Sequence, residues 1–131
     1  MRVLDASLVV EILLQTPLGA RHTDRVLDSN ESLHTPHLLE IETLQAIRRL
    51  TLAGDISIGH AEAALTALLD LPLIRHEHTP FIGRIWALRA SMTAYDATYV
   101  ALAEGLPAVL FTCDGKLARA HGHRARIELL T

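Results

Sequence analysis

The chain has 131 residues, of which 50% are hydrophobic, 21% are charged and 4% are aromatic, and its formal net charge is −3. This length allows one hydrophobic core, so we expect a single domain over residues 1–131, and the composition excludes disordered and fibrous proteins. The small negative charge excludes a broad basic surface, so any nucleic acid would have to be held by a local cationic patch or through metal ions.

The first residues predict a strand, an acid and a helix in immediate succession. A short strand ends at Leu4, Asp5 follows, and the apolar residues between positions 7 and 15 have the spacing of a mostly buried helix. Ligands of open α/β sheets bind at the carboxyl ends of the strands, which makes Asp5 a candidate site residue. Asp5 is equally suited to cap the helix, as Ser7 also is.

The next segments predict a second helix, a short strand and a long helix. The second helix runs from about residue 18 to 27, and residues 33–35 form the strand. Thr35 is followed by proline, the pattern of an N-cap before the first helical position. We therefore expect a helix over residues 36–53 that begins at this cap.

The long helix carries two acids, Glu40 and Glu42, in different surroundings. Helical spacing borders Glu42 with apolar side chains such as Leu38 and Leu39, whereas Glu40 meets more polar neighbours. A carboxylate in dry surroundings requires a partner or a metal. Glu42 is therefore the preferred site residue and Glu40 a second acid nearby, while pairing of Glu42 with Arg49 or with another basic residue on a neighbouring element is the structural alternative.

The middle of the chain predicts a helix and a third strand. Ser57 is expected to cap a helix over residues 58–69, and residues 72–74 form the strand. His76 and His78 then share one face, but two histidines without a third ligand give a weak zinc signal. We interpret them as a solvated strand end.

Two helices are predicted before the next strand. Residues 81–89 have helical spacing, with Trp86 as a core residue or a subunit contact. Residues 91–105 form the second of these helices and end at a glycine. Within it, Thr93 and Asp96 stand three apart and resemble a capping box, which is the structural alternative for Asp96 as a site residue.

The last part of the chain repeats the order of strand, acid and helix seen at Asp5. Residues 108–112 are typical of a buried parallel strand, Asp114 follows, and a helix is expected over residues 115–120. An N-cap is again the structural alternative. Residues 126–130 alternate between polar and apolar side chains, as an edge strand does.

Strands that alternate with helices predict an α/β fold with a mostly parallel sheet of four to five strands. If their strands are neighbours, Asp5 and Asp114 lie at the same edge of the sheet, and Glu42 and Asp96 can point into the same crevice. Crowded carboxylates raise one another's pKa values, and Mg²⁺ or Mn²⁺ would compensate their charge. Such a site suggests phosphodiester hydrolysis. Nearby basic residues that could hold flanking phosphates include Arg49, Arg89 and Lys116.

Four motifs in this order resemble those of the PIN-domain nucleases, and among these the VapC-type toxins of bacterial toxin–antitoxin pairs. They are Val3-Leu4-Asp5-Ala6-Ser7, Thr35 through Glu42 leading to Arg49, Thr93-Ala94-Tyr95-Asp96-Ala97 and Phe111-Thr112-Cys113-Asp114-Gly115-Lys116-Leu117. The resemblance implies a three-layer α/β/α PIN-like fold and a metal-dependent endoribonuclease. It places Asp5, Glu42, Asp96 and Asp114 in the acidic site, with Thr112 as a hydroxyl residue beside it.

The resemblance also implies partners. These are an RNA substrate, a second copy of the chain in a homodimer, and a VapB-type antitoxin whose basic C-terminal tail fills the acidic crevice. Two alternatives stay open, a catalytically inactive PIN-like interaction module and a phosphoacceptor signalling domain. The second is disfavoured because the segment after residues 72–74 offers only Arg75-His76-Glu77 where an acceptor aspartate is required.

The cysteine count and hydropathy indicate where the protein resides. Cys113 is the single cysteine, so no disulfide can form within the chain. The apolar run after Ser7 is interrupted by Glu11 and Gln15, which argues against a secretory signal. No apolar run approaches the roughly 20 residues that a membrane span needs. We therefore expect a cytoplasmic protein without a membrane anchor.

Overall fold

The computed structural model describes residues 1–28 and 30–131, and its centre is a five-stranded sheet. The strand order is β3-β2-β1-β4-β5, and every neighbouring pair is parallel. The strands are β1 (Arg2–Leu4), β2 (Leu33–Pro36), β3 (Leu73–His76), β4 (Val109–Thr112) and β5 (Arg126–Leu129). The prediction of four to five mostly parallel strands is confirmed, and all five are parallel.

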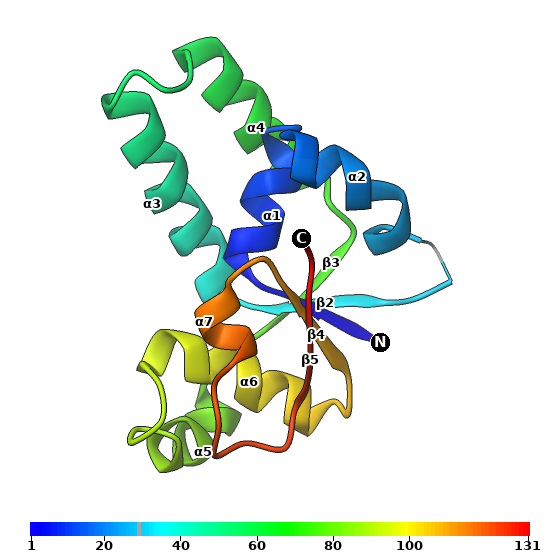
Figure 1. Cartoon of the computed structure of the whole chain (residues 1–131), viewed down its shortest axis with the longest axis vertical. Coiled ribbons are helices and arrows are strands. Elements are labelled where there is room, and N and C mark those ends of the chain that lie inside the picture. The colour runs from blue at the N-terminus through cyan, green and yellow to red at the C-terminus, as the bar shows by residue number, and fades with distance from the viewer. Residues whose placement is uncertain (29) are drawn as a thin grey trace.

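Helices cover both faces of the sheet, which confirms the three-layer α/β/α architecture (Figure 1). One side carries α1 (Ala6–Leu13), α2 (Pro17–Val26), α3 (Leu38–Leu52) and α4 (Ile58–Asp70). The other side carries α5 (Ile82–Ala87), which follows the 3₁₀ turn η1 (Thr79–Phe81), and α6 (Ala94–Gly105). The short helix α7 (Gly115–Ala118) follows β4. Within the described residues, none of these helices has the length and hydropathy that crossing a membrane requires.

The central strand β1 marks the topological switch point of the sheet. The chain adds β2 and β3 on one side of β1, and then returns to add β4 and β5 on the other side. A crevice opens at such a point, outside the carboxyl ends of the strands. Asp5 directly follows β1, and Asp114 stands two residues after β4, so both acids emerge at this crevice.

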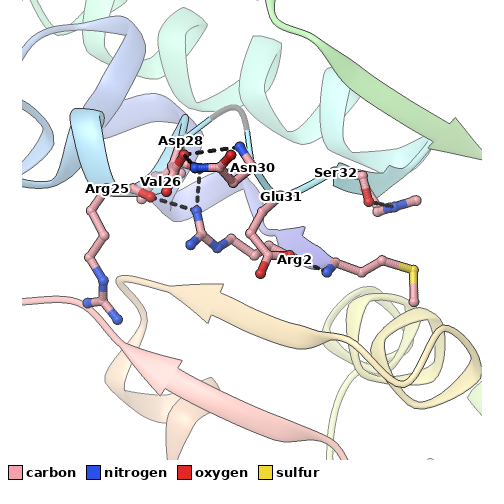
Figure 2. A network of polar contacts seen from close by, with 9 residues as sticks. Arg2, Arg25, Val26, Asp28, Asn30, Glu31 and Ser32 are labelled. Atoms are coloured by element: carbon pink, nitrogen blue, oxygen red, sulfur yellow. Dashed lines mark hydrogen bonds and ion pairs between the residues drawn. The ribbon is translucent and has the colours of Figure 1, made fainter.

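The amino-terminal edge of the sheet is tied to α2 by Arg2 (Figure 2). Its Nη1 donates to the carbonyl oxygens of Arg25 at 2.6 Å and Val26 at 3.2 Å. These carbonyls belong to the last turn of α2, where no acceptor finds a partner inside the helix and where a cation is favoured. The guanidinium groups of Arg2 and Arg25 also lie 5.4 and 5.3 Å from the ring centre of Phe111 on β4. The edge is thus held by a helix cap and two cation–π contacts.

The predicted N-cap at Thr35 is wrong. The strand β2 continues through Pro36, which is paired with His76, and α3 begins at Leu38 without a side-chain cap. The Thr35 hydroxyl instead donates to the carbonyl oxygen of Leu4 at 3.1 Å. A residue before proline is driven to extended backbone angles, which suit a strand as well as an N-cap, so the local sequence did not distinguish the two.

The interpretation of His76 and His78 as a solvated strand end is only partly right, because β3 ends at His76 and both side chains are partly exposed, but both also make hydrogen bonds. Nε2 of His76 lies 2.8 Å from Nδ1 of His34, which is buried, and Nε2 of His78 accepts the backbone N–H of Leu38 at 3.0 Å. Burial lowers the pKa of His34, and the neighbouring His76 adds to this effect. The histidines therefore join β2, β3 and the start of α3.

The helix predicted over residues 81–89 is shorter in the structure, because Phe81 belongs to η1 and Leu88 and Arg89 form a turn. Leu88 is buried, but the Trp86 side chain is 67% exposed. Of the two roles predicted for Trp86, that of a core residue is therefore wrong, and that of a subunit contact stays a prediction. The spacing of apolar residues described a helix with a buried side, and Trp86 lies outside that side.

The contact between α1 and α2 depends on a glycine. A Cβ atom at Gly19 would lie 2.0 Å from the carbonyl oxygen of Glu11, a backbone atom of α1. We expect Gly19→Ala to lower the free energy of unfolding by about 1–3 kcal/mol, because the two helices would have to separate. Urea unfolding followed by circular dichroism measures this loss.

A matched control is Gly59→Ala in α4, where the nearest atom to the new Cβ is Ser57 Oγ at 4.0 Å. It should leave stability unchanged or raise it by up to about 1 kcal/mol, since alanine favours the helix. Equal stabilities of the two variants would contradict the close approach of α1 and α2.

Candidate active site

Four elements carry acids to the carboxyl edge of the sheet. Asp5 precedes α1, Asp114 precedes α7, Asp96 lies in the first turn of α6, and Glu42 lies in the second turn of α3. Burial is the main cause that raises the pKa values of Asp5, Asp96 and Glu42. The charge of Asp114 further raises the pKa of Asp5 and of Asp96, and the charge of Asp96 raises that of Glu42. Pairwise charge effects thus link the four acids in a series, from Asp5 through Asp114 and Asp96 to Glu42.

Asp5 is the most buried member, with 4% of its surface exposed. Its Oδ1 accepts the backbone N–H of Leu8 at 3.1 Å, so Asp5 caps α1 as the structural alternative predicted. The same carboxylate accepts the hydroxyl of Ser7 at 2.8 Å and, through Oδ2, that of Thr112 at 2.5 Å. Burial raises the pKa of Asp5 to about 6, although these donors favour the ionised form. Capping and membership of the acidic group are therefore compatible.

The hydroxyls of Ser7 and Thr112 connect the loops that follow β1 and β4. While both donate to Asp5, Ser7 Oγ accepts the backbone N–H of Cys113 at 3.0 Å and Thr112 Oγ1 accepts that of Asp114 at 2.9 Å. These bonds hold Asp114 beside Asp5. The contact of Ser7 across the two loops was missed in the sequence, where Ser7 was considered only as a cap.

Asp114 and Asp96 both stand at helix starts, but they cap them differently. Oδ1 of Asp114 accepts the backbone N–H groups of Lys116 at 2.8 Å and Leu117 at 3.4 Å. At α6 the cap is the Thr93 hydroxyl, which accepts the backbone N–H of Asp96 at 3.1 Å. The carboxylate of Asp96 is thus not required for this cap, and it lines a pocket with Lys116, whose charge lowers the pKa of Asp96.

The partner of Glu42 is Tyr99, not Arg49 as the structural alternative predicted. The Tyr99 hydroxyl donates to Oε1 of Glu42 at 2.6 Å. Tyr99 is only 2% exposed, and burial, followed by the hydrogen bond and charge of Glu42, raises its pKa. This contact was not among those predicted from the sequence. Its signal was the position of Tyr99 three residues after Asp96, which places both side chains on neighbouring parts of one helix surface.

Glu40, the second acid considered in α3, makes a different contact. Its Oε1 accepts the Nε–H of Arg75 at 2.8 Å, and both side chains are partly exposed. This ion pair joins α3 to β3. Glu42, by contrast, lies in a pocket with Leu38 and Tyr95, which agrees with the preference for Glu42 over Glu40.

The three basic residues predicted to contact phosphates lie in three different places. Lys116 shares the pocket of Asp96, and Arg119 lines the same pocket. Arg49 lines the pocket of Glu42. Arg89 lies over the ring of Trp86, 4.6 Å from its centre.

The chemistry of this acidic group suits a hard divalent cation that keeps much of its water. The side chains offer carboxylate and hydroxyl oxygens, and Mg²⁺ is usually held by one or two carboxylates together with several waters. Within residues 1–28 and 30–131, no three Asp, Glu, His or Cys side chains are grouped closely enough to form a metal site alone. A cation bound by one or two of these carboxylates directly, and by the others through water, therefore fits the group better than a dry cage.

The comparisons with known proteins agree with this architecture. Residues 2–122 match the model of the PIN domain. The chain is 43% identical over 130 residues to ribonuclease VapC12 of Mycobacterium tuberculosis, with 99% of each chain covered. The chain therefore belongs to the PIN-domain family, and its full-length likeness is to proteins named VapC ribonucleases.

Solved structures share the fold at lower sequence identity. VapBC2 from Rickettsia felis, solved bound to a DNA fragment from its promoter, has a TM-score of 0.71 and 14% identity, covering 99% of this chain and 98% of that one. VapC20 of Mycobacterium tuberculosis, described as a toxin that cleaves the sarcin-ricin loop, has a TM-score of 0.69 and 14% identity, covering 90% of this chain and 93% of that one. These likenesses concern the fold alone.

The buried carboxyl group of Asp5 makes one pH-dependent contribution to stability. Its folded pKa of about 6 lies above the ordinary value of 3.8, so this group's contribution is fully present below pH 3.8 and is lost as the pH rises through 6. An asparagine at position 5 can still cap the helix, but it carries no charge. The stability advantage of Asp5→Asn over the natural protein should therefore grow by about 2–3 kcal/mol between pH 4 and pH 8.

Urea unfolding of both proteins at the two pH values, in the presence of EDTA, measures this difference. The chelator ensures that no bound cation offsets the charge of Asp5. A difference that stays constant with pH would show that the carboxylate titrates normally.

Proposed function

We propose that this protein is a metal-dependent endoribonuclease and the toxin of a toxin–antitoxin pair. The observation that carries the proposal is the coupled group of acids at the switch point, made by Asp5, Glu42, Asp96 and Asp114. Membership of the PIN-domain family and 43% identity to a protein named ribonuclease VapC12 support it.

In this proposal the four carboxylates hold Mg²⁺ or Mn²⁺, directly or through its waters. A bound cation would lower the pKa of a water molecule and neutralise charge on the scissile phosphate. The chain's own residues position this chemistry. Ser7 and Thr112 fix the Asp5 carboxylate, and the Tyr99 hydroxyl occupies one oxygen of Glu42, which leaves the other oxygen for water.

RNA is the proposed substrate, and basic residues around the acids would contact its flanking phosphates. Lys116 is the strongest candidate, because it lies in the pocket of Asp96 and acts on that carboxylate electrostatically. Arg49 beside Glu42 and Arg89 beside Trp86 would contact phosphates further from the reacting bond. Such contacts position a nucleic acid without reading its sequence.

We further propose two protein partners. An antitoxin with a basic C-terminal tail would bring cationic side chains to the acids and so compete with the metal ion. The name of the neighbour VapBC2 supports a paired partner. A homodimer is proposed because large apolar side chains are exposed along α3, namely Ile41, Leu44 and Leu52. Residues 1–131 are proposed to be a single domain.

The two alternative functions are not favoured. An inactive interaction module would not require four coupled acids at one crevice. The lack of an aspartate after residues 72–74 does not count against a signalling domain, because β3 is an edge strand and the acceptor would follow a central one. The acid after the central strand is Asp5, which is buried and bonded to Leu8, Ser7 and Thr112 and is therefore a poor phosphate acceptor.

Asp96→Asn is expected to lower RNA cleavage by at least about 100-fold, because it removes one charge of the acidic group. The fold should remain, since the α6 cap uses the Thr93 hydroxyl and the backbone of Asp96. Cleavage of labelled single-stranded RNA with Mg²⁺ or Mn²⁺ measures the loss, and circular dichroism checks the fold. Full activity of the natural protein in EDTA would rule out the metal mechanism.

Glu42→Gln and Glu40→Gln form a matched pair in the same helix. Glu42→Gln should lower cleavage by about 10- to 100-fold, as expected for a group that orients metal-bound water. Glu40→Gln removes only the contact with Arg75 and should cleave RNA at the natural rate. The two variants are compared at equal concentration after a thermal melt of each. The reverse order of activities would place Glu40 in the site instead.

A further inference from the structure

The single tryptophan of the chain lies on the surface with a cation held over it. Trp86 is 67% exposed on α5. The guanidinium carbon of Arg89 lies 4.6 Å from its ring centre, and Nη1 of Arg89 donates to the Trp86 carbonyl oxygen at 3.1 Å. This bond holds the cation against the indole. Most of the indole surface nevertheless remains open to a ligand.

Trp86 and Arg89 line a surface groove of about 420 Å³. Its floor is apolar and includes Ile85 and Met92, and its end is formed by the residues that begin α6. A volume of this size is that of a small-ligand site. The groove can therefore receive a flat apolar group beside a positive charge.

The groove leads to the acidic group. Met92 lines both the groove and the neighbouring pocket, and that pocket contains Asp96, Lys116 and Arg119. A path thus runs from Trp86, past Met92, to a carboxylate of the proposed site. Arg89 lies at the start of this path, and two further cations lie at its end. An exposed aromatic ring followed by spaced cations is the combination that single-stranded nucleic acids require.

We propose that Trp86 and Arg89 form a nucleobase-stacking site for single-stranded RNA next to the scissile phosphate. This inference rests on the proposed ribonuclease function. One base stacks on the open indole surface, and Arg89, Lys116 and Arg119 contact the backbone phosphates between that base and Asp96. Bases in a duplex are already stacked and paired, so the site takes loops and unpaired segments.

The charges along the path favour RNA over a second copy of the chain as the occupant. Of the described residues that line the groove and its neighbouring pocket, Asp96 is the one acid, whereas Arg89, Lys116 and Arg119 are cations. A symmetric contact between two copies through this path would enclose these cations with little opposite charge. Phosphates supply that charge.

The fluorescence of Trp86 tests the proposal directly, because no other tryptophan contributes. The titration uses the Asp96→Asn variant in EDTA, so that the RNA is not cleaved during the measurement. A single-stranded oligoribonucleotide of about 12 nucleotides should quench the emission to saturation, and the same sequence as a duplex should not. Binding of a labelled oligoribonucleotide is measured in parallel by anisotropy.

Substitutions test whether the indole ring of Trp86, and not the surface around it, binds the RNA. Trp86→Leu should weaken RNA binding by about 5- to 150-fold, the loss expected for one stacked base, and Trp86→Phe should retain most of the affinity. The matched control is Leu69→Ala, which removes an exposed apolar side chain from α4. It should bind RNA as tightly as the parent. The quenching titration, which uses the unchanged Trp86, keeps the test valid if the leucine variant fails to fold.

The outcomes distinguish this proposal from the proposed function. Bound RNA without quenching would overturn the stacking site. So would RNA cleavage by otherwise natural Trp86→Leu with an unchanged KM, and that result would leave the nuclease proposal standing. An emission that depends on protein concentration but not on RNA would identify the groove as an interface between copies and overturn the proposal. Quenching by RNA in a protein that never cleaves it would support the stacking site and count against the nuclease.

Discussion

The buried carboxylate of Asp5 at the end of β1 is the constraint on which the rest of the site depends. A charge covered by helices on both faces of a parallel sheet is unfavourable unless donors surround it. One donor comes from the following helix, and the Thr112 hydroxyl comes from β4. Thr112 also accepts the backbone N–H of Asp114. The hydroxyl that stabilises the Asp5 carboxylate therefore also positions Asp114.

This arrangement leaves the crevice short of positive charge. Burial raises the pKa values of Asp5, Asp96 and Glu42, and each nearby carboxylate adds to the effect. Any cation that enters lowers the free energy of the ionised group. In the proposed function, a metal ion, a lysine of an antitoxin and Lys116 would each supply positive charge to these carboxylates. Competition between metal and inhibitor would then need no conformational change.

The sequence was sufficient to place Asp5 and Asp114 at one edge of the sheet, because the topology determines their positions. Asp5 and Asp114 follow strands that become neighbours in a parallel sheet, so the order of strand, acid and helix was sufficient. The contacts that orient the acids were not predictable in this way. Ser7 meets Cys113 at a separation of 106 residues, and Tyr99 meets Glu42 at a separation of 57. Such contacts depend on the directions of side chains in the folded state. The spacing of apolar residues does not predict these directions.

The wrong predictions for Thr35 and Trp86 share a physical cause. The same local sequence pattern is compatible with two different structural environments. Thr35 before proline is extended in a cap and in a strand alike, and the sheet decided between them. An aromatic residue at helical spacing is assigned to the interior by the same logic, yet Trp86 faces solvent under Arg89. Asp5 and Asp114 lie where two neighbouring strands end, whereas Trp86 and Arg89 lie on a short helix and in the turn after it. In the proposed function, the chemistry would therefore depend largely on strand order, and the recognition of RNA on side chains whose positions follow no hydrophobic period.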